Sequence, residues 1–290
     1  MPRLELSIII VSWNVSKHLN ICLNSIYKNS ENIEFEIIVI DNNSKDNTLS
    51  LIKKKFPQVK LISNKKNFGF ATAVNQGLAQ SKGKYLLLLN PDTVLLPDTL
   101  KKSLTYMKKN HFTGVMGPKI LNSDLSLQPS CRRFPTTLSQ TLILLKIHHI
   151  FPKLRSLRKY LMQDFDYKES KEVDQVMGAY FLIRRSVLEK VGGFDENFYI
   201  LFEEVDFCRR VKEVGLKVDF YPLVKIIHHG GESFKKVKSI RSQINFNRSL
   251  LYYFKKYHSS FSYYWLALLT PLSLFLALLT PFFAVFQRKN

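Results

Sequence analysis

The chain has 290 residues, and 46% of them are hydrophobic, which is enough to build one large α/β domain or two small ones. Its cysteines, Cys22, Cys131 and Cys208, are odd in number and widely spaced, so they argue against a disulfide framework or a zinc cluster and favour a reducing compartment. The formal net charge of +20 indicates an anionic partner, either nucleic acid or an anionic membrane surface.

The first 120 residues alternate between continuous apolar runs and amphipathic stretches. The apolar runs predict buried strands at residues 6–12, 35–40, 59–63 and 85–89. Apolar residues at helical spacing predict helices that include residues 19–27, 49–56 and 71–79. We expect Asp46 to cap the second of these helices. Buried strands separated by helices predict an α/β fold with a mostly parallel sheet that is covered on both faces.

Polar residues gather directly after these predicted strands. They are Ser12-Trp13-Asn14, Asp41-Asn42-Asn43, Asn64 and Asn90-Pro91-Asp92. In parallel α/β sheets, ligands bind beyond the carboxyl ends of the strands. The sequence therefore predicts a binding site at this edge of the sheet.

The middle of the chain, at residues 138–161, mixes apolar residues with lysines and arginines. Such a basic amphipathic stretch fits a membrane surface, and it fits equally a solvated helix packed on the domain. Further along, VMGAYFLIRR at 176–185 predicts a strand, and SVLEKV predicts a helix that ends at Gly192-Gly193. An acidic segment at 203–206 precedes a helix through Val214, and a last strand is expected at 217–221.

The segment from Tyr263 to Phe286 has no charged residue and is long enough to cross a bilayer, given about 1.5 Å per helical residue and about 30 Å of hydrocarbon. Its basic and aromatic flanks, typical of membrane interfaces, are Lys255, Lys256, Tyr263, Tyr264, Trp265, Arg288 and Lys289. Pro271 and Pro281 are compatible with a bent span or with a hairpin in one leaflet. The alternative is a buried core helix. We expect a catalytic domain at residues 1–250 and a membrane-associated tail at residues 251–290.

Several motifs occur together in one order along the chain: VSWN, DNNSKDNT, NFGFATAVNQG, LLLNPDT, GAYFLIRR, GGFDENFYILFEEVDFCRR and IIHHGGES. This order resembles that of the inverting family 2 glycosyltransferases of the GT-A fold, and more narrowly the rhamnosyltransferase-like members that extend bacterial polysaccharides. The resemblance covers roughly residues 5 to 235 and excludes the hydrophobic tail. It implies a GT-A type nucleotide-diphospho-sugar transferase fold.

The resemblance implies a divalent metal ion, Mg²⁺ or Mn²⁺, which stabilises the diphosphate leaving group. Asp92 is the expected carboxylate ligand, while Asn90 replaces the first acid of the family's Asp-x-Asp signature. A histidine, His228 or His229, is the expected second ligand. Because adjacent residues on a strand point to opposite faces, we expect one of the two to reach the metal, and we favour His229.

The donor side follows from the same resemblance. Asp41 is expected to accept a hydrogen bond from the nucleotide base, and Asn43, Ser12 and Asn14 to add polar contacts. Asn67 and Gly69 belong to a loop beside the donor, in which Gly69 lets the backbone approach the ligand. Ser44 and Asp46 are assigned to the turn and to helix capping. The remaining expected contacts, to the sugar and the phosphates, are Gly178, Ala179 and Arg184.

The acceptor side is assigned to the acidic segment that contains Glu203, Glu204 and Asp206. An inverting transfer needs a carboxylate that removes the proton of the attacking hydroxyl. The family's first aspartate corresponds to Glu204 here, so the base is either Glu204 or Asp206. The same acidic residues also complement the dipole of the helix that follows.

We therefore expect a glycosyltransferase that uses dTDP-rhamnose, with a UDP-hexose or UDP-galactofuranose as competing donors, and a lipid-linked saccharide as acceptor. The amino terminus lacks the apolar core of a secretory signal, so we expect the enzyme to act on the cytoplasmic face of the membrane. One alternative is a basic nucleic-acid-binding protein, but no recognised module occurs and the basic residues are dispersed, so no nucleic-acid partner is expected. The other is an inactive scaffold, favoured by the departures at Asn90 and Glu204. The sequence leaves the oligomeric state open.

Overall fold

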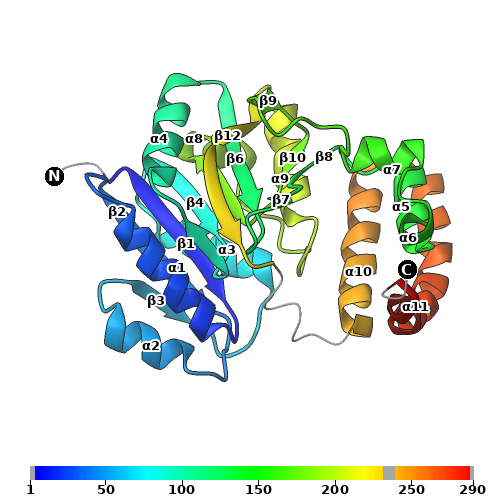
Figure 1. Ribbon diagram of the computed structural model, residues 1–290, viewed down its shortest axis with the longest axis horizontal. Helices are drawn as coiled ribbons and strands as arrows, with labels where there is room; N and C mark the ends of the chain where they lie inside the picture. Colours follow the sequence, from blue (N-terminus) through cyan, green and yellow to red (C-terminus); the bar gives the residue numbers. More distant parts are fainter. Residues whose placement is uncertain (1–3, 231–238, 288–290) are drawn as a thin grey trace.

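A computed structural model describes residues 4–230 and 239–287 of the chain (Figure 1). Its main sheet runs from one edge to the other in the order β3 (Lys60–Ser63), β2 (Phe35–Asp41), β1 (Leu6–Ser12), β4 (Tyr85–Leu89), β11 (Tyr180–Arg184), β6 (Thr113–Leu121), β12 (Lys217–His228) and β5 (Thr93–Leu95). Short strands β7 (Leu127–Gln128) and β9 (Lys171–Glu172) extend it beside β6 and β12, while β8 (Cys131–Arg132) pairs with β10 (Gln175–Val176).

The strand directions confirm a mostly parallel GT-A-like sheet. Strands β3, β2, β1 and β4 are parallel to one another, and so are β6 and β12. Strand β11 is antiparallel to both of its neighbours, β4 and β6, and β5 is antiparallel to β12. The carboxyl ends of β1, β2 and β4 therefore meet at one edge of the sheet, as predicted.

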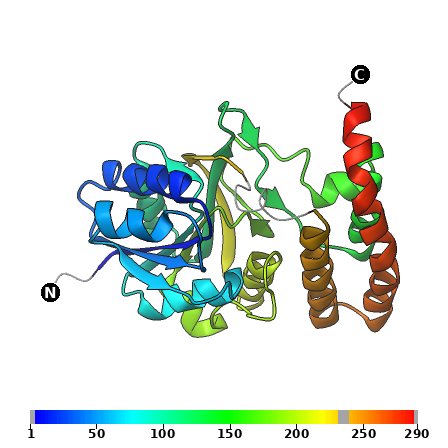
Figure 2. The same cartoon turned by 90° about the horizontal axis from the view of Figure 1, so that it is seen from below.

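Helices cover both faces of the sheet because its central strands are apolar on both sides (Figure 2). Ile8 and Ile10 of β1 pack with α1 (Ser16–Lys28), α2 (Thr48–Lys55) and α4 (Thr99–Lys109). Ile9 faces the other way and packs in the core that holds α3 (Phe70–Gln80), α8 (Arg185–Val191) and α9 (Glu203–Glu213). The predicted strands and helices of the first half are thus confirmed.

The second half differs from prediction at two strands. The segment 176–185 is interrupted, since β10 ends at Val176 and β11 begins at Tyr180, with Met177–Ala179 forming a turn between them. The strand expected at 217–221 continues to His228, with an irregular register between Tyr221 and Lys225. This long strand carries the histidines to the carboxyl edge of the sheet.

A helical unit lies beside the sheet domain (Figures 1 and 2). It comprises α5 (Thr137–Leu144), α6 (Ile147–Ile150), α7 (Arg155–Tyr160), α10 (Ser239–Tyr257) and α11 (Ser260–Gln287). A third core, which contains Leu144, Phe202, Val205, Phe254 and Leu266, joins this unit to α9. The domain boundary expected at residue 250 falls inside α10. Helix α10 packs against α11 and belongs to the same helical unit.

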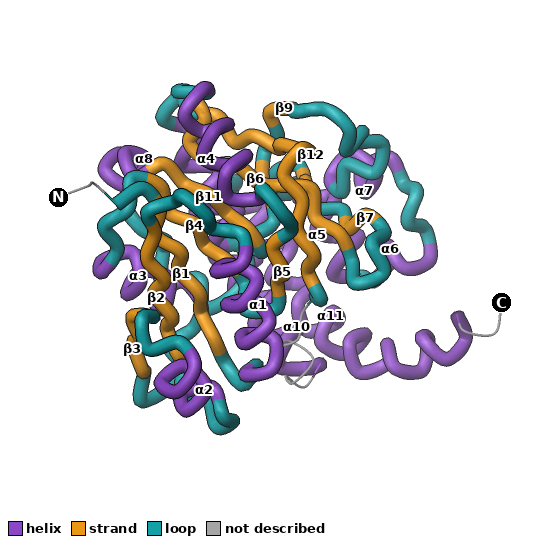
Figure 3. Tube along the Cα trace, turned by 60° about the vertical axis from the view of Figure 1, so that its left-hand side comes forward, coloured by secondary structure: helices purple, strands orange, loops and turns teal. Residues whose placement is uncertain are grey.

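Helix α11 contains the uncharged segment that the sequence predicts to be membrane-associated. It runs as one helix from Ser260 to Gln287, through both prolines, so the hairpin alternative is wrong. Residues Ser260–Leu278 are long and apolar enough to cross a membrane. Phe261 and Leu268 are 75% and 72% exposed, which argues against a buried core helix. Figure 3 shows the last turns of α11 projecting from the body of the molecule.

Candidate active site

The ends of β1 and β2 place two buried polar side chains next to each other. Ser12 and Asp41 are paired in the strand register, and both are fully buried. One Asp41 oxygen accepts a hydrogen bond from the Ser44 amide at 3.0 Å. The other Asp41 oxygen and the Ser12 hydroxyl have no hydrogen-bond partner among the described residues. Because buried polar atoms are rarely left unpaired, these two atoms are suited to meet a ligand.

The loops after β1 and β2 are tied to each other. The Asn14 amide donates to the Ser44 hydroxyl at 2.9 Å, and the Asn14 side chain accepts from the Lys45 amide at 2.6 Å. Asp46 accepts hydrogen bonds from the amides of Ser16 and Thr48, so it caps α1 as well as α2. The hydrogen bond to Thr48 supports the predicted capping of α2, although the residue at the N-cap position itself is Asn47. Asn43, with a φ of 67°, lies in the same turn.

Asn42 holds the third loop of this edge, a role that the sequence reading missed. Its buried side-chain amide donates to the Gly69 carbonyl and to the Asn67 side chain. Its oxygen accepts from the Phe68 amide and the Asn64 side chain. A buried asparagine inside a run of polar residues is the signal that would have marked it. The Asn67 side chain therefore helps to hold the conformation of the loop.

Gly69 is required by a contact within the protein. Its φ is +91°, and a Cβ at this position would lie 2.5 Å from the Tyr199 carbonyl oxygen. The adjacent Phe70 amide donates to that same carbonyl at 2.7 Å. The space that a Cβ would need is therefore filled by Tyr199, and the glycine permits this protein contact.

The segment after β4 brings together the groups expected to face a metal. Asp92 and His228 are both buried, and His228 Nε2 lies 3.3 Å from Asp92 Oδ1. The Asn90 side-chain amide lies 3.4 Å from the same histidine nitrogen. His228 Nδ1 is 2.7 Å from the Gln128 side-chain oxygen, a contact that fixes the orientation of the ring.

The two histidines point in different directions, as predicted, but the preference for His229 is not supported. Its Nδ1 lies 2.7 Å from the Ser123 hydroxyl, and its ring lies 5.5 Å from that of His18. Its backbone amide nevertheless donates to the Asp92 carbonyl at 2.9 Å. His228 is therefore the better-placed side chain. The last part of the motif, residues 231–233, lies outside the described residues.

Asp92 and His228 offer an oxygen and a nitrogen ligand of the kind that Mn²⁺ or Mg²⁺ accepts, with Asn90 beside them. In the part of the chain that the structure describes, no group of three or more histidine, cysteine or acidic side chains forms a complete metal site. A pair of protein ligands fits a metal ion whose other ligands are phosphate oxygens and water.

The turn between β10 and β11 connects this group to the acidic helix. The Ala179 carbonyl accepts a hydrogen bond from the Asn90 amide at 3.0 Å. The neighbouring Gly178 faces Glu204, whose Cβ would lie 3.9 Å from a Cβ placed on the glycine. Gly178 and Ala179 thus separate Asn90 from Glu204 by a single turn of backbone.

Glu203 and Glu204 begin α9 in a poorly solvated position. Burial, and secondly the charge of Glu204, raise the pKa of Glu203 well above its usual value. Burial also raises the pKa of Glu204, against the opposing charge of Arg132. One oxygen of each glutamate has no hydrogen-bond partner among the described residues. A carboxylate with a raised pKa and an unpaired oxygen is a competent general base.

Asp206 does not fit the alternative assignment as base. It is fully buried, and its oxygens accept hydrogen bonds from Arg210 at 2.8 Å, from Lys256 at 2.7 Å and from the Tyr257 hydroxyl at 2.7 Å. These contacts occupy the carboxylate and join α9 to α10. We therefore correct the assignment of Asp206 from candidate base to structural ion pair.

Arg184 is also placed wrongly by the sequence reading. It pairs with Tyr85 at the start of β4, because β11 is antiparallel to β4. Its guanidinium donates to the carbonyls of Met107, Asn110 and Thr113. Arg184 therefore lies at the amino end of β4, whereas Asn90 follows its carboxyl end. The Arg184 side chain binds backbone carbonyls at the end of α4 and just after it.

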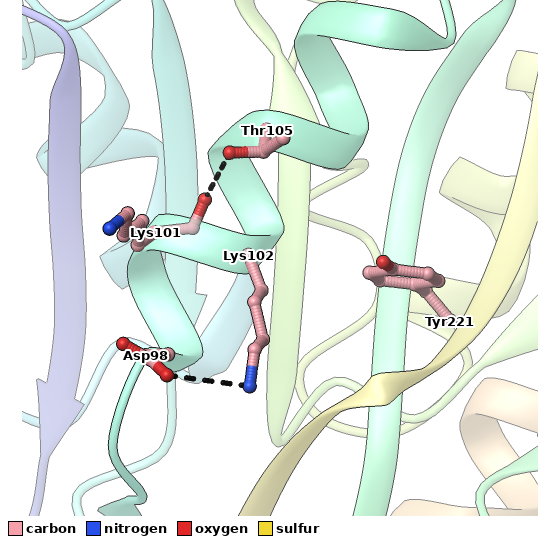
Figure 4. Close-up of a pocket in the computed structure, with 5 residues that line it drawn as sticks. All are labelled: Asp98, Lys101, Lys102, Thr105 and Tyr221. Carbon is pink, nitrogen blue, oxygen red and sulfur yellow. Dashed lines mark hydrogen bonds and ion pairs between the residues drawn. The ribbon is translucent and has the colours of Figure 1, made fainter.

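An open pocket lies away from these residues, between α4 and β12 (Figure 4). It is lined by Asp98, Lys101, Lys102, Thr105 and Tyr221. Figure 4 shows Lys102 directed toward Asp98, an exposed ion pair of 3.5 Å. None of the residues predicted from the motifs lines this pocket.

Comparisons with known proteins show the family of the chain. The model of the family "Glycosyl transferase family 2" matches residues 7–192. An N-acetylglucosaminyl-diphospho-decaprenol L-rhamnosyltransferase of Mycobacterium tuberculosis is 26% identical over 239 residues, which cover 79% of this chain and 77% of the relative. Rhamnosyltransferase WbbL of Escherichia coli is 26% identical over 239 residues, covering 78% and 85%.

A solved structure is similar in fold. The mannosyltransferase PcManGT from Pyrobaculum calidifontis, in complex with GDP-Man and Mn²⁺, superimposes with a TM-score of 0.59 at 17% sequence identity. The match covers 95% of this chain and 73% of that structure. At this level of identity, the similarity supports the GT-A-like fold alone.

Proposed function

The chain belongs to glycosyl transferase family 2, and we propose that it is an inverting, metal-dependent sugar transferase that acts on a lipid-linked saccharide. The observation that carries the proposal is the convergence after β4 of Asp92, His228 and Asn90, one backbone turn from Glu204. This convergence supplies a metal-binding pair and a base in one region. The family model covers residues 7–192, which include Asn90 and Asp92 but not Glu204 or His228.

The nucleotide of the donor would lie across the ends of β1 and β2. The unpaired oxygen of Asp41 is suited to accept a hydrogen bond from a base, and the Ser12 hydroxyl lies beside it. The Asn67–Gly69 loop, held by Asn42, borders the same edge. Asn14 and Asn43 belong to the loops around the nucleoside, and we retain them as proposed contacts.

Asp92 and His228 would hold the divalent ion, which offsets the charge that develops on the diphosphate leaving group. Glu204 would accept the proton of the acceptor hydroxyl as its oxygen attacks the anomeric carbon from the face opposite the diphosphate. The new sugar–oxygen bond forms as the old one breaks, and the configuration at that carbon inverts. Gly178 and Ala179 would border the sugar between these groups.

We propose dTDP-rhamnose as donor, with a UDP-hexose or UDP-galactofuranose as the alternatives, and a cell-surface polysaccharide or glycolipid as the product. The support is the similarity to two rhamnosyltransferases, one of which is named for a diphospho-decaprenol acceptor. Such an acceptor would place the enzyme at the cytoplasmic face of the membrane, in agreement with its net charge of +20 and with the apolar helix α11.

The test is a panel of nucleotide-sugars presented to the purified chain with Mn²⁺ or Mg²⁺. We expect one donor to be bound and slowly hydrolysed, and hydrolysis to stop in a chelator. Asp92→Ala should abolish hydrolysis without loss of the folded state, whereas Asp164→Ala, an exposed aspartate paired with Arg158, should leave it unchanged. Full activity of Asp92→Ala would refute the metal assignment.

A further inference from the structure

The outer face of α11 is an uninterrupted apolar stripe. Between Ser260 and Leu278 the helix has no charged residue. Its exposed large side chains recur every three or four residues, which places them on one side of the helix. They are Phe261, Tyr264, Trp265, Leu268, Leu272, Phe275 and Leu278. A stripe of this length is unusual on a surface that faces water.

The inner face of the first half of α11 is attached to α10 and α5. Leu266 is buried in the third core, and the Asn247 side chain of α10 donates to the Thr270 carbonyl at 3.4 Å. Trp265, a residue of the stripe that is 40% exposed, also reaches α5, where its indole donates to the Thr141 hydroxyl at 2.9 Å. Helix α11 is therefore one wall of a packed unit and not a separate anchor.

Packing against α10 restricts how α11 can meet a bilayer. Helix α10 lies alongside α11 (Figure 1). It carries three exposed charged residues, Arg241, Arg248 and Lys255. If α11 crossed the hydrocarbon, α10 would have to enter it or separate from α11. Charged residues are strongly disfavoured at the centre of a bilayer. An orientation parallel to the membrane surface keeps α10 in water and buries only the stripe.

The segment around α6 and α7 offers a second region for membrane contact, and this region carries the positive charge that attraction to an anionic membrane requires. Ile150 and Phe151 are 70% and 59% exposed, and Leu154 is also exposed. Lys153 and Arg155 flank them. The segment lies at the same end of the molecule as α11 (Figures 1 and 3). Apolar side chains interleaved with cations are complementary to the headgroup region of an anionic leaflet.

We propose that α11, together with the α6–α7 segment, lies in the plane of one leaflet of an anionic phospholipid membrane and does not cross it. The inference rests on the membrane location in the proposed function and specifies its geometry. Because the third core joins α9 to the same unit, this orientation would hold Glu204 near the surface from which a lipid-linked acceptor emerges.

Binding is tested by flotation of the purified full chain with vesicles of phosphatidylcholine alone or with 30% phosphatidylglycerol, a composition that mimics an anionic leaflet. We expect binding to the anionic vesicles, reduced at least tenfold by Leu268→Glu, because a charge replaces a lipid-facing side chain. The matched control is Leu223→Glu on β12, which is 62% exposed in the sheet domain and should bind normally. Equal binding of both variants would overturn the proposed surface.

Orientation is tested with single tryptophans, since the chain has two, Trp13 and Trp265. Both are replaced by phenylalanine, and one tryptophan is then introduced by Phe261→Trp, Leu268→Trp or Phe275→Trp. The depth of each tryptophan is measured from the quenching of its fluorescence by lipids brominated at different depths. The first and last of these positions are about 21 Å apart along the axis, at roughly 1.5 Å per residue. Equal, shallow depths support the in-plane orientation, whereas a progressive change in depth would show that α11 crosses the bilayer.

These outcomes are separable from the proposed reaction. Leu268→Glu should hydrolyse the donor in detergent at the wild-type rate, because the residue is remote from Asp92. If wild type binds vesicles but hydrolyses no nucleotide-sugar, the proposed function fails and the docking surface stands. If hydrolysis occurs without vesicle binding, the docking surface fails alone.

Discussion

Asp206→Asn tests whether this carboxylate is structural. The substitution keeps the shape of the side chain but removes a buried charge that faces Arg210, Lys256 and Tyr257. Breaking a buried ion pair by removing one partner costs about 3–5 kcal/mol. In this variant Lys256 keeps its ion pair with Asp195, at 2.8 Å, and Arg210 keeps its hydrogen bonds to backbone carbonyls. We therefore expect the free energy of unfolding to fall by about 3 kcal/mol, the lower end of that range.

The loss is measured as the free energy of unfolding in urea, with the full chain kept in a mild detergent. The control is Asp98→Asn, whose 3.5 Å pair with Lys102 is exposed on both sides and should contribute no more than about 1 kcal/mol. If Asp206→Asn unfolds at the same urea concentration as Asp98→Asn, the carboxylate does not anchor α9 to α10. Our reason for excluding it as the base would then fail.

Three further predictions concern the site. Glu204→Gln should lower the rate of transfer about 10²–10⁴-fold and leave the free energy of unfolding unchanged. The wild-type rate should fall as the pH drops through the raised pKa of Glu204, because the base must be ionised. A transfer rate that is independent of pH would contradict this assignment. His228→Ala should weaken Mn²⁺ binding in calorimetry at least about tenfold, and His229→Ala should not, because His228 lies beside Asp92; the reverse order would restore the original preference. Gly69→Ala should lose about 1–3 kcal/mol in thermal unfolding, more than Gly215→Ala, whose φ is also positive but whose added Cβ meets nothing within 4 Å.

The linear sequence was sufficient for the features that depend on neighbouring residues. Apolar runs located β1, β2 and β4 because a buried parallel strand must be apolar on both faces. Polar residues after those strands marked the edge at which Ser12, Asp41 and Asp92 lie. The motif order indicated the family because it compares whole segments and requires no knowledge of their contacts.

The assignments that changed depend on strand direction and on contacts between distant segments. The pattern of β11 is apolar whether it runs parallel or antiparallel, so only the sheet shows that Arg184 lies at the far edge. Asp206 resembles a catalytic acid until Lys256, fifty residues later in the chain, is seen to neutralise it. The orientation of His228 toward Asp92 follows from the pairing of β12 with β5, opposite Thr93. Local periodicity determines which residues form an element, whereas long-range packing determines which of their side chains are left available for chemistry.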